Sequence, residues 1–88
     1  MLFGDVKSKV TGDHLPYAII KVKGTRLVTQ CDATGHFKLG DLPLGKQTVI
    51  ASVVGYKDQQ LVVEMKRNTG TGAYFQLEED ELSINQVV

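Results

Sequence analysis

The sequence predicts an all-β domain, because three observations about its 88 residues agree. Apolar residues recur at every second position in several stretches, which is the period of a strand with one buried face. Turn-forming residues separate these stretches at intervals of about 8–12 residues, a spacing typical of a β-sandwich or β-barrel. No window of a dozen residues carries the apolar stripe of a helix, which repeats about every 3.6 residues.

The strands are expected in seven stretches with alternating or β-rich composition: residues 2–8, 17–24, 26–31, 36–39, 46–57, 58–65 and 73–77. In the second stretch, the apolar residues Ala18, Ile20 and Val22 alternate with mostly basic neighbours. Such alternation predicts a strand whose apolar side faces the interior of the domain.

The fifth stretch, residues 46–57, is the longest of the expected strands. It places Val49, Ala51 and Val53 on one side. We expect Gly55 and Tyr56 to end this strand with a bend, because Gly tolerates backbone conformations that a regular strand does not use.

Turn signals rich in Gly, Asp, Asn, Thr and Pro separate these stretches: residues 11–13, 23–25, 32–35, 42–45 and 68–72. The turn at residues 32–35 reads Asp-Ala-Thr-Gly. We interpret it as a hairpin turn in which Asp32 accepts hydrogen bonds from its own backbone and Gly35 supplies a positive φ.

The stretch GDLPLGKQT, Gly40 to Thr48, almost matches a phosphate-binding loop. Such a loop needs Ser or Thr directly after the Lys, and a helix whose N-terminus meets the phosphates. Here Gln47 follows Lys46, Pro43 removes one amide donor, and the β-branched run that comes next indicates a strand. We therefore interpret the stretch as a turn that leads into a strand, and expect no bound nucleotide.

No metal site is expected from the spacing of the possible ligands. His14, His36 and the single Cys31 do not match the spacing of a zinc site. We expect both histidines to be exposed residues that flank turns. Asp32 and Gly35 suggest a calcium loop only superficially, because the alternating oxygen ligands and the distant Glu are missing.

No catalytic residue or cofactor-binding residue can be nominated, and we expect that the domain is not an enzyme. Cys31 lacks a basic neighbour in the sequence to lower its thiol pKa, so we expect an inert thiol facing the interior. The acidic run from Glu78 to Glu81 is contiguous, whereas acid–base catalysis needs two carboxyl groups that converge on one bond. We expect this run to keep the chain solvated as it leaves the last strand.

Charge and hydropathy exclude further classes. Ten basic and ten acidic residues cancel, so the excess positive charge expected of a nucleic-acid-binding domain is absent. No apolar run approaches the roughly 18–20 residues needed to cross a membrane as a helix. No signal peptide is visible, and both ends of the sequence stop within a pattern, so we expect a fragment of a longer protein.

Taken in order, the motifs LFGDV, HLPYAIIKVKGT, CDATGHFKLGDLPLG, VIASVVGY, FQLEED and INQVV resemble the carboxypeptidase-regulatory-like domain. The resemblance is to the copy at the N-terminus of SusC-like TonB-dependent outer-membrane receptors, and it covers residues 4–88. Each motif alone is weak, but their shared order is specific. The sequence departs from the usual pattern at Tyr17, where a small residue is common, at Cys31 for Thr, at Ile84 for Leu and at Gln86 for Glu.

This resemblance implies a transthyretin-like, Greek-key sandwich of about seven strands without an active site. Residues 1–79 would form the sandwich, and residues 80–88 an extended exit segment that leads toward a TonB box and plug. The domain would lie on the periplasmic side of the outer membrane, as a spacer or docking module of a nutrient or glycan transporter. Its partners would be the receptor's own plug and barrel and, through the intact receptor, TonB and a surface lipoprotein.

Two other readings remain open from the sequence. The domain could be the accessory sandwich of a secreted carbohydrate-active enzyme or metallocarboxypeptidase, although the chain has no Trp and only three Tyr and three Phe for an aromatic sugar-binding platform. A cytoplasmic enzyme is the third reading. The reading frame beyond Val88 would distinguish the receptor from the secreted enzyme.

Overall fold

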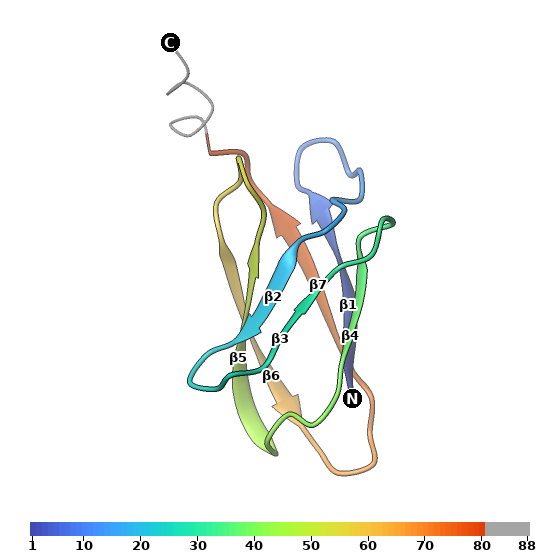
Figure 1. Cartoon of the computed structure of the whole chain (residues 1–88), viewed down its shortest axis with the longest axis vertical. Helices are drawn as coiled ribbons and strands as arrows, with labels where there is room; N and C mark the ends of the chain where they lie inside the picture. The colour runs from blue at the N-terminus through green and yellow to red at the C-terminus, as the bar shows by residue number, and fades with distance from the viewer. Residues whose placement is uncertain (81–88) are drawn as a thin grey trace.

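The computed structural model describes residues 1–80 as a sandwich of two β-sheets (Figure 1). The strands, in chain order, are β1 (Leu2–Ser8), β2 (Ile19–Val22), β3 (Val28–Gln30), β4 (His36–Leu39), β5 (Gly45–Ser52), β6 (Gln59–Met65) and β7 (Thr71–Leu77). No helix occurs within these 80 residues. The prediction of an all-β sandwich with about seven strands is confirmed.

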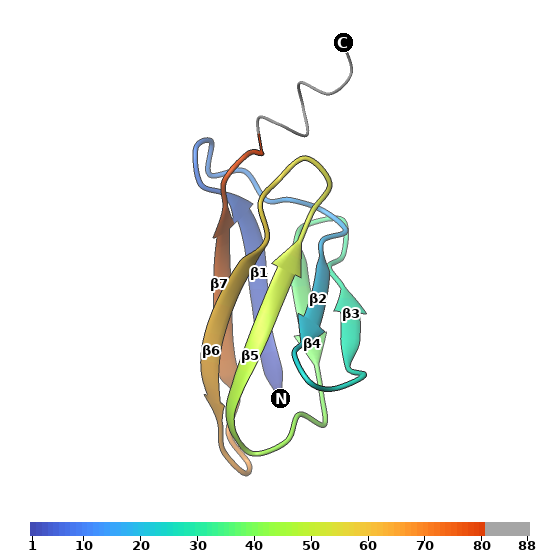
Figure 2. The same ribbon diagram turned by 90° about the vertical axis from the view of Figure 1, so that its left-hand side faces the viewer.

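The two sheets contain three and four strands, in the orders β4-β1-β7 and β3-β2-β5-β6. All strand pairs are antiparallel except β1 and β7, which run parallel from the Leu2–Thr71 pair to the Ser8–Leu77 pair. The chain therefore crosses between the sheets four times, and neighbours such as β2 and β5 are distant in sequence. Figure 2 looks onto the four-stranded sheet, with the three-stranded sheet behind it.

The core lies between the sheets and is formed by every second residue of the central strands. In β1 the even-numbered residues are buried and the odd-numbered ones are at least partly exposed, while β7 buries Ala73, Phe75 and Leu77. The rings of Phe37 and Phe75 pack with their centroids 6.2 Å apart. The largest fully buried side chains come from both sheets: Phe75, Leu2, Ile20, Leu77, Val6, Val22 and Val49.

Gly4 lets β1 approach β7 closely. A Cβ atom at this inward-facing position would overlap the carbonyl oxygen of Ala73 and lie 3.1 Å from the Phe37 ring. A backbone carbonyl within a ladder cannot move aside as a flexible side chain can. Any side chain at position 4 would therefore separate the two strands.

Two details of the strand predictions are wrong. The expected strand at residues 46–57 ends at Ser52, because residues 53–56 form a turn with Gly55 at φ 88° and the Tyr56 amide bonded to the Val53 carbonyl oxygen at 3.0 Å. Val54 is consequently 99% exposed. The turn at residues 32–35 does not close a hairpin either, because β3 and β4 belong to different sheets.

Candidate functional site

The candidate site lies on the outer face of the three-stranded sheet, where β1 changes its partner. The first half of β1 pairs with β4, from Leu2 opposite Leu39 to Asp5 opposite His36. Beyond Asp5, the loop before β2 replaces β4 as the hydrogen-bonding partner of β1. Its Leu15 amide donates to the Val6 carbonyl oxygen at 2.8 Å, and the Ser8 amide donates to Asp13 at 2.8 Å.

This change of partner brings three polar side chains together. Asp5 and His36 are directly opposite residues of adjacent strands. In antiparallel sheets the Cβ atoms of such a pair are generally about 4.5–5.5 Å apart. His14 forms an isolated bridge with Lys7, two residues further along β1. Since alternate residues of β1 share a face, His14 reaches the same outer surface as Asp5 and His36.

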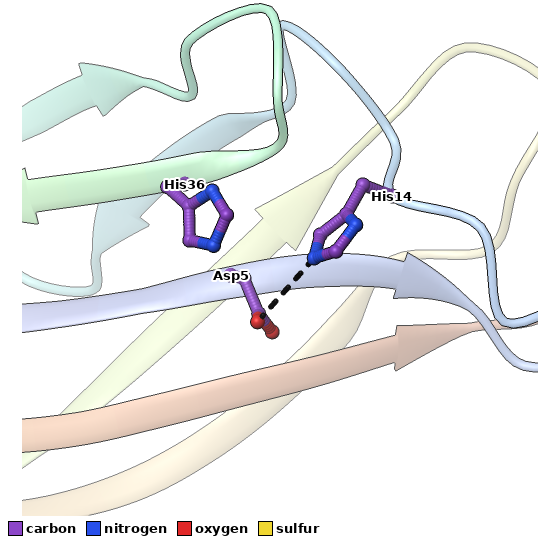
Figure 3. Close-up of side chains that lie close together, drawn as sticks. All are labelled: Asp5, His14 and His36. Carbon is purple, nitrogen blue, oxygen red and sulfur yellow. Dashed lines mark ion pairs between the residues drawn. The ribbon is translucent and has the colours of Figure 1, made fainter.

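Figure 3 shows the Asp5 carboxylate and the two imidazole rings directed toward one another. His14 Nε2 lies 3.7 Å from Asp5 Oδ2, and the two ring centroids are 5.0 Å apart. One nitrogen from each ring and one carboxylate oxygen all lie within 4.8 Å of one another. We call Asp5, His14 and His36 the Asp–His–His cluster.

Gly35 makes this close approach possible. Its φ of 79° is in the left-handed region that favours glycine, as the turn at residues 32–35 requires. A Cβ atom there would lie 3.0 Å from the Cβ of His14 and 3.1 Å from the Val6 carbonyl oxygen. Glycine at this position therefore permits both the turn and the contact between the two histidine-bearing segments.

The same turn orients His36. Asp32 Oδ1 accepts hydrogen bonds from the Thr34 amide at 2.9 Å, the Thr34 hydroxyl at 2.7 Å and the His36 amide at 3.1 Å. These bonds, led by that of the Thr34 hydroxyl, lower the pKa of Asp32 below its ordinary value. The predicted roles of Asp32 as a backbone acceptor and Gly35 as the residue with positive φ are both confirmed.

Thr34 connects Asp32 to the His36 ring. Its Oγ1 lies 2.9 Å from His36 Nδ1 while its hydroxyl proton points to Asp32. The oxygen is therefore free to accept, so Nδ1 of a neutral His36 carries the proton and donates it. The Nε2 atom of His36 is left with a lone pair.

An open hollow of about 620 Å³ lies beside the cluster. Asp5 and His36 contribute to its wall, together with the half-exposed rings of Phe3 and Tyr74 and the side chain of Lys38. The hollow thus combines apolar surface with charged groups of both signs. A molecule or side chain bound there would lie next to the Asp–His–His cluster.

The sequence predicted the surroundings of the two histidines but not their proximity. Both are exposed residues that flank turns, as expected. Nothing in the local sequence around Asp5 indicates that β1 and β4 pair with Asp5 opposite His36. The DVKS and GHF segments would have suggested the cluster only if this register had been known.

Cys31 lies outside the cluster and is buried, with 2% of its surface exposed. Its amide donates to the Ala18 carbonyl oxygen at 2.8 Å, just after β3 ends. Burial, reinforced by the nearby charge of Asp32, raises the pKa of the thiol to about 11. The prediction of an interior thiol is confirmed, and its pKa favours the unreactive form at neutral pH.

The other two stretches considered in the sequence are structural. In the phosphate-loop-like stretch, residues 40–44 form an irregular connection that leads into β5 at Gly45, so the interpretation as a connection is confirmed. The side chains of Glu78 and Glu79 are exposed, as expected, while Glu81 lies outside the described residues. None of the described residues belongs to a helix long and apolar enough to span a membrane.

A model of the CarboxypepD_reg-like domain family matches residues 2–88. The chain belongs to this family. The match includes the whole described sandwich, in agreement with the resemblance seen in the ordered motifs. A search of curated proteins found no match to the sequence.

Among solved structures, the CarboxypepD_reg-like chain is similar to a chain of a type II cohesin–X-dockerin complex from Acetivibrio cellulolyticus. The TM-score is 0.63 at 14% sequence identity, over 84% of this chain and 51% of the other. The chain thus spans about half the length of the matched one. At this identity the likeness shows the shared β-sandwich fold alone.

Proposed function

We propose that this domain is the non-catalytic, periplasmic accessory domain of a SusC-like TonB-dependent outer-membrane transporter. In this role it acts as a spacer and docking module between the receptor's plug and its energy-coupling partner. Membership of the CarboxypepD_reg-like family supports the proposal, as do the VVGY and INQVV motifs that resemble the receptor branch of that family.

The observation that carries the proposal is the way the sandwich holds the end of its last strand. The Lys57 amide donates to the Glu78 carbonyl oxygen at 2.8 Å, and the Asp80 amide donates to Gly55 at 2.9 Å. Lys9 Nζ also lies 3.0 Å from Glu78 Oε1. Two separate parts of the chain, the loop between β5 and β6 and the residue after β1, thus hold residues 78–80, as a module that presents a following segment requires.

The segment itself suits recognition by strand addition. Ile84, Val87 and Val88 are apolar and β-branched, and they follow an acidic run that favours solvation. In strand addition, backbone hydrogen bonds supply affinity and alternate side chains supply selectivity. TonB, or the receptor's own plug, is the partner that this proposal assigns to the segment.

The test uses the intact receptor with residues 1–77 deleted. We expect nutrient transport to fall while substrate binding at the cell surface stays near that of the unmodified receptor, because the domain holds neither the substrate site nor the pore. A matched control carries Val28→Ser, since Val28 is 55% exposed and lies on β3, an edge strand of the four-stranded sheet to which β7 does not belong. Loss of surface binding in the deletion variant, or unchanged transport, would contradict the proposal.

The alternative is an accessory sandwich of a secreted carbohydrate-active enzyme or metallocarboxypeptidase. The reading frame beyond the Val88 codon distinguishes the two. An encoded plug and many amphipathic strands would support the receptor, and an encoded hydrolase domain would support the alternative. A reading frame that encodes neither a plug nor a hydrolase domain would contradict both proposed functions.

A further inference from the structure

We propose that Asp5, His14 and His36 bind a divalent transition-metal ion, with Zn²⁺ as the reference ion. The proposal does not depend on the transport role. Zinc bonds to imidazole nitrogen at about 2.0–2.1 Å and to carboxylate oxygen at about 2.0–2.2 Å, so tetrahedral ligand atoms lie roughly 3.3–3.5 Å apart. The corresponding atoms here lie 3.7 Å apart for His14 and Asp5, and within 4.8 Å for the whole cluster.

Small side-chain rotations would close this difference. His14 and His36 are exposed, so their rings can turn without disturbing the core. The backbone positions beneath them are already held, by the β1–β4 ladder at Asp5 and His36 and by the bonds of the loop that carries His14. Binding would therefore order two side chains rather than a segment, which keeps its entropic cost low.

The surroundings of His36 match those of metal-binding histidines. Such residues almost always donate their second ring N–H to a carboxylate, carbonyl or water, which fixes the ring and makes the ligating nitrogen more basic. Here Nδ1 donates to Thr34 Oγ1, and that hydroxyl donates to Asp32. Nε2 of His36 is left as the ligand, and the carboxylate of Asp32 is connected to the opposite side of the ring through the Thr34 hydroxyl.

The donor set selects the class of ion. Two imidazole nitrogens and one carboxylate oxygen suit Zn²⁺, Co²⁺, Ni²⁺ and Cu²⁺, whereas Mg²⁺ and Ca²⁺ prefer sites made of oxygen atoms alone. Three protein ligands leave one tetrahedral position for water or for a donor from a bound molecule. Because Asp5 and His36 also line the hollow, such a molecule would lie in it.

A bound ion would also link three segments of the sandwich. Its ligands come from β1, from the loop before β2 and from the first residue of β4. An ion that binds the folded chain and not the unfolded chain raises the midpoint of thermal unfolding. At a free ion concentration about 100 times the dissociation constant, the expected rise for a domain of this size is roughly 10–20 °C.

The experiment uses the tag-free 88-residue chain, treated with a chelator, because a polyhistidine tag would bind the same ions. Isothermal titration with Zn²⁺ should show one ion per chain, and Co²⁺ should give the visible absorption bands of a tetrahedral site. Mg²⁺ should give neither binding heat nor a thermal shift. During the Zn²⁺ titration, the ring protons of His14 and His36 should shift together in NMR spectra.

Matched variants locate the ligands. His36→Ala and Asp5→Asn should abolish the Zn²⁺-dependent thermal shift, whereas Lys38→Ala on the same face of β4 and Asp13→Asn beside His14 should retain it. All four side chains are outside the core, so circular dichroism without metal should show the same fold for every variant.

Thr34 is a positioning residue in this proposal. Thr34→Ala should weaken Zn²⁺ binding about 10–100-fold, and Thr34→Ser should restore it by keeping the hydroxyl. The proposal is overturned if Zn²⁺ gives no thermal shift, if only one histidine responds in the NMR titration, or if the double variant His14→Ala/His36→Ala binds as tightly as the unmodified chain.

Discussion

Phe75→Ala should destabilise the domain severely, whereas Tyr74→Ala, at the neighbouring position of the same strand, should not. Phe75 is fully buried in β7 beside Val6 of β1, and its ring packs against that of Phe37 at 6.2 Å. Truncating a buried Phe to Ala costs about 3–5 kcal/mol, because both the transfer free energy and the packing around the cavity are lost. Tyr74 faces outward and is 61% exposed, so its truncation should cost less than about 1 kcal/mol.

For a domain of this size, each kcal/mol lowers the unfolding midpoint by about 4–8 °C. A loss of about 4 kcal/mol therefore predicts a midpoint lower by roughly 16–32 °C for Phe75→Ala. Total stabilities of about 5–15 kcal/mol mean that this variant could fail to fold, so Phe75→Leu, with an expected cost of about 1–2 kcal/mol, provides a second measurement.

The assay is thermal and urea unfolding, both followed by far-ultraviolet circular dichroism because the chain has no Trp for fluorescence. The comparison tests the register of β7 directly. A shift of one residue would exchange the two faces of the strand and turn Tyr74 inward. If Tyr74→Ala proved as costly as Phe75→Ala, the assigned faces of β7 would be wrong.

Three further predictions concern two ionisable groups, Cys31 and Glu78. Burial raises the thiol pKa of Cys31 to about 11. A thiol reagent at pH 8 should therefore label the native chain far more slowly than the urea-unfolded chain. Equal labelling rates would contradict a buried thiol. The same shift makes the protonated form the more stable one in the folded state. Stability should therefore begin to fall above pH 9 and continue to fall toward pH 11, and this decrease should be smaller in Cys31→Ala. The hydrogen bond from Lys9 lowers the pKa of Glu78 most, and the charges of Lys9 and Lys57 lower it further. Lys9→Met should therefore raise the pKa of Glu78 in an NMR titration. The control variant Lys21→Met should leave the pKa of Glu78 unchanged. The Glu78 carboxylate stabilises the fold above the pKa that it has in the unfolded chain, and this contribution is lost as the pH falls. An unchanged Glu78 titration in Lys9→Met would refute the assigned cause.

Local alternation in the sequence predicted most of the strands and the faces that they bury. Period-two alternation marks Ala18, Ile20 and Val22 as interior residues, and all three are buried. Alternation is a local property that depends only on the pleat of an extended chain, so it can be read without knowing the neighbours of a strand. It failed after Ser52, where Val53 and Val54 continue the β-branched composition but the chain turns, because composition alone does not mark where pairing stops.

The order and register of the strands follow from the packing of the whole sandwich and from no local pattern. The parallel pairing of β1 with β7 joins residues about 70 positions apart, and no local pattern specifies it. The Asp–His–His cluster likewise depends on strand pairing. Asp5, His14 and His36 come from three segments that meet where β1 stops pairing with β4 and begins to bond with the loop before β2. Ligand spacing along a sequence indicates a metal site when one local element carries the ligands. Here the register of a sheet edge brings them together, and that register follows from packing the whole sandwich.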